Sequence, residues 1–204
     1  NQEGDRTDFS TRVSEEGLPG GNIDDDDFDN DEATSFDQTN AIQSSVATNI
    51  DAGIAVTLVG PAGITSGGQT VTWLWDGSTQ TLTGHVGTEP NTTDVMTVVV
   101  DDSAATLALI VTLSQPLDHT AGDNIEGVLN VSIAVNHENT TDLISQVNVI
   151  VEDDIPVSLT TDQPLSSPID NSNIVATGSI SFDAGADGAQ SVLFAAGAEG
   201  SIAV

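Results

Sequence analysis

Residues 71–84 read VTWLWDGSTQTLTG, two short runs of β-branched and aromatic residues on either side of a polar turn. In the first run, Val71, Trp73 and Trp75 occupy alternate positions. This period of two is that of a β-strand and places both tryptophans on one face of a sheet. We therefore expect the tryptophans to pack in a sheet core rather than to contact a ligand.

Similar short runs recur along the chain. They lie at residues 54–59, 80–86, 95–101, 106–113, 128–135 and 144–151. Their enrichment in β-branched residues and the turn residues between them are typical of an antiparallel sandwich. No helical periodicity extends over a dozen residues. The sequence therefore predicts an all-β fold, an antiparallel β-sandwich of the Ig-like or cadherin-like kind.

Changes in composition suggest three segments. Residues 1–43 are polar and acidic and are interpreted as a leader with an edge strand, and residues 44–155 as the sandwich body. Residues 151–157 read VEDDIPV, and three acids before a proline predict a short extended connector. Residues 156–204 are then a linker followed by strands that either begin a second module or complete the first.

The charge of the chain is strongly one-sided. Thirty-two Asp and Glu stand against Arg6 and Arg12, for a formal net charge of −30 over 204 residues. Charge of one sign at this density opposes compaction by self-repulsion. Ca²⁺ binds six to eight oxygen ligands in irregular geometry, so it is the counter-ion that clustered carboxylates favour. The sequence thus predicts a calcium-stabilised fold.

The same composition excludes several classes of protein. The negative charge and the low aromatic content of 3% exclude nucleic-acid binding. The chain has no cysteine, so disulfides do not stabilise it. No run is long enough and apolar enough to span a membrane.

Candidate calcium ligands follow the predicted strands. Glu152, Asp153 and Asp154 are the first choice, because adjacent acids at a strand exit offer both side chains and backbone carbonyls to one cation. Asp101 and Asp102 leave another strand in the same way. The simpler interpretation of both groups is a solvated linker or turn.

Three further acidic segments are candidates. Asp183 and Asp187 lie in a glycine-containing loop, where plain turn chemistry is the alternative, and Asp118 lies in the QPLDH segment at residues 115–119. Residues 24–32 read DDDDFDNDE, which indicates either a solvated tail or a calcium-sensitive loop.

No catalytic constellation is visible in the sequence. His85, His119 and His137 are far apart and none belongs to an HExxH motif, and no GxSxG motif occurs. We expect His119 to fix its loop through a hydrogen bond to Asp118. The sequence therefore predicts that the protein is not an enzyme.

Five segments together resemble the repeat modules of giant bacterial RTX adhesins and related type I secretion proteins. They are EEGLPGGN at 15–22, VTWLWDGSTQTLTG at 71–84, QPLDH at 115–119, EDDIP at 152–156 and GADGA at 185–189. Their order and spacing carry the resemblance across most of the chain. Two features differ: residues 136–142 read NHENTTD where the repeats have a DxDGD turn, and the GGxGxD nonapeptides of the secretion region are absent.

The resemblance implies a secreted, calcium-dependent module of a long cell-surface fibre that supports attachment and biofilm formation. Its partners would be neighbouring adhesin modules and an adjacent or inserted ligand-binding domain, with the module itself a monomer. The alternative function is a calcium-dependent carbohydrate- or peptide-binding domain in its own right. In both cases the expected location is extracellular, on the bacterial surface.

Overall fold

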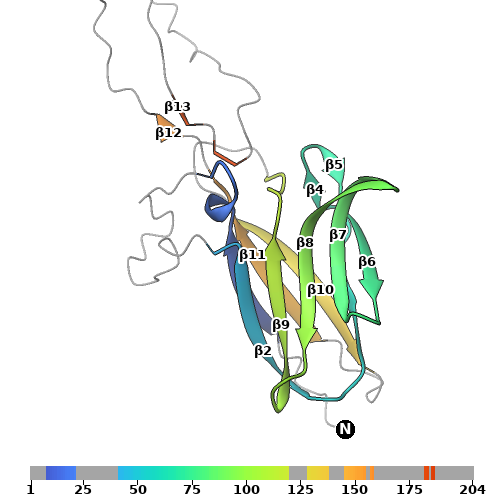
Figure 1. The fold of residues 1–204 in the computed structure, drawn as a ribbon. Coiled ribbons are helices and arrows are strands. Elements are labelled where there is room, and N and C mark those ends of the chain that lie inside the picture. Colours follow the sequence, from blue (N-terminus) through green and yellow to red (C-terminus); the bar gives the residue numbers. More distant parts are fainter. Residues whose placement is uncertain are drawn as a thin grey trace, which may run out of the picture.

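The computed structural model describes residues 8–21, 41–119, 128–137, 145–154, 157–158, 182–183 and 185–186 (Figure 1). Within these residues the fold is all-β, apart from one short 3-10 helix, η1 (Glu15–Gly17). The strands of the first half are β1 (Asp8–Ser14), β2 (Gln43–Asp51), β3 (Val56–Val59), β4 (Thr65–Ser66), β5 (Gln69–Thr70), β6 (Thr72–Asp76) and β7 (Thr81–Thr88). Those of the second half are β8 (Asn91–Asp101), β9 (Thr106–Leu113), β10 (Val128–His137), β11 (Ser145–Glu152), β12 (Val157–Ser158) and β13 (Phe182–Asp183).

Two sheets form the two layers of a sandwich (Figure 1). One has the strand order β1-β11-β10-β3, and the other has the order β2-β9-β8-β7-β6. Their strands pair antiparallel except for β1 and β11, which run parallel with Ser14 opposite Glu152. The predicted all-β fold with antiparallel sheets is confirmed, and the parallel β1–β11 pair is an addition that the sequence did not predict.

Alternating side chains from both sheets form one core. In β9 every second residue is buried, and Leu107, Leu109, Val111 and Leu113 each expose 2% or less. Val131, Ile133, Val147, Val149 and Val151 from the other sheet belong to the same cluster. Trp73 and Trp75 pack against this core, as predicted, and the ring of Trp73 leaves no room for a Cβ at Gly60 or Gly84.

The hydrogen-bonding pattern defines the two ends of the sandwich. At one end, β1 leads into η1, the Ser14 N–H donates to the carbonyl of Ala41, and the Leu113 N–H donates to the carbonyl of Ile42. At the other end lie the turns that join β6 to β7 and β8 to β9, where the Val100 N–H donates to the carbonyl of Gln80. The chain therefore alternates between an η1 end and a hairpin end (Figure 1).

Outside the two main sheets, β12 and β13 pair antiparallel as a separate two-stranded ladder near the η1 end (Figure 1). No helix among the described residues is long and apolar enough to cross a membrane.

Candidate metal centre

Five acidic residues lie where β1 and β11 end, and we call them the acidic end. They are Glu15, Glu16, Glu152, Asp153 and Asp154. Three of them are buried: Glu15 is 0% exposed, Glu16 6% and Asp154 3%. A buried carboxylate is costly unless it is paired, hydrogen-bonded or bound to a cation. The burial therefore requires specific compensation at this end.

Glu15 is positioned by η1 and by the turn that follows it. Ser14 caps the helix by accepting a hydrogen bond from the Glu16 N–H at 3.2 Å. The Leu18 N–H closes the turn onto the Glu15 carbonyl, and buried Leu18 anchors it to the core. Gly21 then packs so closely that a Cβ would lie 2.3 Å from the Glu16 carbonyl oxygen. Gly21 of the EEGLPGGN segment thus allows the chain to fold tightly against η1.

His119 is positioned by a loop that leaves β9 and is held by the β4–β5 hairpin. The Ser66 hydroxyl donates to the Pro116 carbonyl at 2.5 Å, and the Asp118 N–H donates to the Thr65 carbonyl at 2.8 Å. The Asp118 carboxylate accepts from the Gly68 N–H at 2.9 Å. The Asp118 side chain thus contacts the hairpin, a partner that the sequence did not predict for it.

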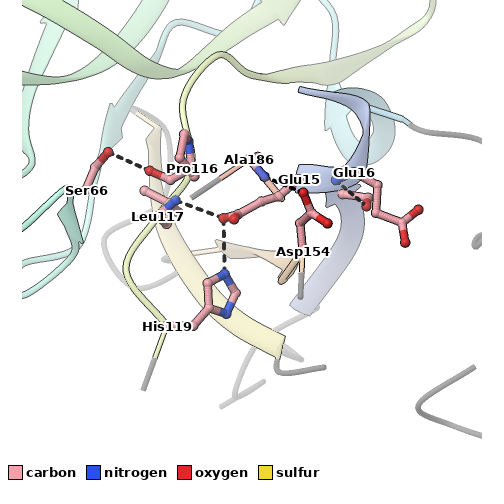
Figure 2. Close-up of polar contacts among 9 residues, drawn as sticks. Glu15, Glu16, Ser66, Pro116, Leu117, His119, Asp154 and Ala186 are labelled. Atoms are coloured by element: carbon pink, nitrogen blue, oxygen red, sulfur yellow. Dashed lines mark hydrogen bonds and ion pairs between the residues drawn. The ribbon is translucent and has the colours of Figure 1, made fainter. Parts of the chain in front are cut away.

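The Glu15 side chain points toward this loop from the other side (Figure 2). Its Oε1 accepts a hydrogen bond from the Leu117 N–H at 2.8 Å and lies 3.1 Å from Nε2 of His119, 104 residues away. The two side chains are 0% and 7% exposed. This contact joins the segment that follows β1 in one sheet to the loop that follows β9 in the other.

Asp153 completes a three-residue group. One ligand atom each from Glu15, His119 and Asp153 lies within 4.8 Å of the other two, the one such group of three among the residues that the structure describes. Burial raises the pKa of the Asp153 carboxyl, and the charge of His119 lowers it in part. Burial thus disfavours the ionised form of Asp153, and a positive charge beside it favours that form. We call Glu15, His119 and Asp153 the triad.

Asp154 faces a different segment. Its Oδ2 accepts a hydrogen bond from the Ala186 N–H at 2.5 Å (Figure 2). Gly185 has φ +72°, and a Cβ there would lie 2.9 Å from both the carbonyl and the carboxylate oxygens of Asp154. Asp154 therefore holds the chain that follows β13 against the end of the sandwich.

The donors at the acidic end fit Ca²⁺ only in part. The carboxylates supply the oxygen ligands that Ca²⁺ prefers. The triad also includes an imidazole nitrogen, which suits transition metals better than a hard cation.

The other predicted ligands lie elsewhere. Asp101 forms a local turn at the hairpin end, accepting from the Ser103 N–H at 2.9 Å, and Asp102 is exposed. The structure brings neither into a group of three potential ligands among the described residues. Asp183 lies in β13 with its side chain undescribed, and Asp187, the 24–32 run and residues 138–142 lie outside the described residues.

Sequence reasoning placed Asp153 among the candidate ligands but missed Glu15 and gave His119 another partner. They belong to two segments of the resemblance, Glu15 to EEGLPGGN and His119 to QPLDH. Neither segment shows by itself which distant side chain it contacts, because the fold brings the two together.

Searches of the chain against protein-family models, curated proteins and solved structures gave no significant match.

Proposed function

We propose that the chain is a structural module of a secreted bacterial surface adhesin, and that Ca²⁺ bound at its acidic end stabilises the sandwich. The observation that supports a bound cation is the burial of Glu15, Glu16 and Asp154 in a chain of net charge −30. With two arginines in the whole sequence, protein cations are too few to neutralise its carboxylates. A divalent cation supplies that charge without a basic residue.

The role as a module within a longer fibre is supported by the junction at Asp154. The buried Asp154 carboxylate accepts a hydrogen bond from the Ala186 N–H, and β12 pairs with β13 nearby. Such contacts restrain the chain that leaves the sandwich, as a fibre built of consecutive units needs. The assignment to adhesins and to the bacterial surface rests on the sequence resemblance.

Thermal unfolding of the full chain with Ca²⁺ and with EDTA tests the cation. At a hundredfold excess over its dissociation constant, one site stabilises by about 2.7 kcal/mol, which raises the midpoint by roughly 5–10 °C for a chain of this size. The double variant Glu16→Gln/Asp154→Asn should lose most of this response. The matched control Asp101→Asn/Asp102→Asn, at the hairpin end, should keep it.

An unchanged midpoint in EDTA would remove calcium from the proposal. A response that the hairpin-end variant abolishes and the acidic-end variant retains would place the ion at Asp101 and Asp102 instead.

A further inference from the structure

We infer that the triad is a site for a divalent transition ion such as Zn²⁺, distinct in its ion preference from the oxygen ligands that surround it. This site goes beyond the proposed calcium-stabilised module, because it assigns an ion of another chemical class to three named side chains.

The donor set of the triad suits a transition ion. The triad offers one imidazole nitrogen and two carboxylates, from residues 15, 119 and 153. Imidazole and carboxylate together are common ligands of Zn²⁺, whereas Ca²⁺ sites are built from oxygen. A buried histidine that faces two acids is therefore better matched to a transition ion than to Ca²⁺.

The spacing of the donor atoms is also close to that of a zinc site. Two ligands about 2.0–2.1 Å from one Zn²⁺ at a tetrahedral angle lie about 3.3–3.4 Å apart. Glu15 Oε1 and His119 Nε2 are already 3.1 Å apart, and an Asp153 oxygen lies within 4.8 Å of one ligand atom of each of these two residues. Small side-chain adjustments are enough to bring the three donors onto one ion.

Hydrogen bonds from neighbouring residues hold the ligands in place. The Leu117 N–H donates to Glu15 Oε1 and thereby orients the carboxylate. The loop that presents His119 is held by the Ser66–Pro116 and Asp118–Gly68 hydrogen bonds. Metal ligands are typically fixed by such outer contacts.

The proton balance is simple. For Nε2 to bind the ion, its lone pair must be free, so any proton now shared between His119 and Glu15 moves to Nδ1 or is released to solvent. The ion then takes the place of that proton, and its two positive charges offset the two carboxylates.

The experiment uses the full chain, treated with EDTA, dialysed, and kept in excess Ca²⁺ so that sites made of oxygen alone are filled. Zn²⁺ and Co²⁺ are titrated by calorimetry, and Co²⁺ is also followed by its visible absorption. We expect one ion per chain. His119→Gln should weaken binding by at least about tenfold. His85→Gln, which removes a histidine on β7 outside the triad, should bind as the parent does.

If His119→Gln does not fold, the parent protein answers the question by NMR. Adding Zn²⁺ should shift the ring nitrogen signals of His119 and leave those of His85 in place. Equal binding by His119→Gln and the parent, unshifted His119 signals, or no Zn²⁺ binding in the presence of excess Ca²⁺ would overturn the inference.

The two proposals fail separately. A midpoint that rises with Ca²⁺ while Zn²⁺ leaves His119 unchanged retains the calcium-stabilised module and removes the transition-ion site. A Zn²⁺ response at His119 without any Ca²⁺ response retains the transition-ion site and removes the calcium-stabilised module.

Discussion

The two ends of the sandwich use acidic residues in different ways. At the hairpin end, Asp76 and Asp101 each accept a hydrogen bond from a backbone N–H two residues later, at 2.8 and 2.9 Å. At the acidic end, Glu15 meets a loop 104 residues away and Asp154 meets residue 186. The first arrangement is local turn chemistry and the second is tertiary structure.

This difference shows that an acid at a strand exit has no fixed role. Asp101–Asp102 and Glu152–Asp154 follow their strands in the same manner. The nearest hydrogen-bond donor for Asp101 is in its own turn, so its carboxylate stays exposed to water. Asp153 and Asp154 lie where three chain segments converge, so their carboxylates face other parts of the protein.

The largest expected effect is that of Glu15→Ala. This change leaves the Leu117 N–H and His119 without the buried carboxylate that they share. Removing one partner of a buried charged contact typically costs about 3–5 kcal/mol. Urea unfolding measures the loss, and Asp102→Ala at the hairpin end should leave the midpoint nearly unchanged. Equal losses in the two variants would erase the difference between the ends.

Asp154→Ala should have the next largest effect. The Ala186 N–H then loses a charged acceptor, and a hydrogen bond of this kind contributes about 1.5–3 kcal/mol. Amide hydrogen exchange at Ala186 should accelerate, while the amides of β9 in the core keep their protection. Unchanged exchange at Ala186 would mean that Asp154 does not hold the following segment.

Much of the fold was predictable because burial in a sandwich repeats every two residues. The β9 prediction, residues 106–113, matches the structure at both ends, and every second residue of TLALIVTL is buried. The strand β1, DFSTRVS, was harder to predict, because polar Thr11 lies between Phe9 and Val13 on its inward side.

The candidate site was predictable only in part, for a physical reason. Asp153 could be found because an acidic run after a strand is visible in one stretch of sequence. The contact between Glu15 and His119 depends on the parallel pairing of β1 with β11 and on the β4–β5 hairpin that holds residues 116–118. These are long-range features that no local pattern encodes.

Gly21→Ala tests whether the tight turn after η1 is needed to place Glu15. A Cβ at this position would lie 2.3 Å from the Glu16 carbonyl oxygen, so the backbone must move. Overpacking of this kind typically costs about 1–3 kcal/mol. Gly77→Ala at the hairpin end is the matched control, because its Cβ would meet Trp75 at an ordinary 3.6 Å. We expect Gly21→Ala to lower both the unfolding midpoint and the affinity for Zn²⁺, and a loss confined to stability would separate the turn from the site.

The smallest expected effects are in the pH dependence of the metal-free protein, where the two ends should differ in sign. Hydrogen bonds from Ser78 and Ser103 lower the pKa of Asp76 and Asp101 below 3.8, so their contributions are present above pH 3.8 and are lost as the pH falls through the folded-state pKa. Burial raises the pKa of Asp153, so its contribution is present below pH 3.8 and is lost as the pH rises through the folded-state value. In EDTA, Asp153→Asn should therefore remove a decline in stability above pH 3.8, whereas Asp101→Asn should flatten the acid limb. Urea unfolding midpoints of both variants, measured across this pH range, test this difference. A change of the same sign in the pH dependence of the two midpoints would contradict the assignment.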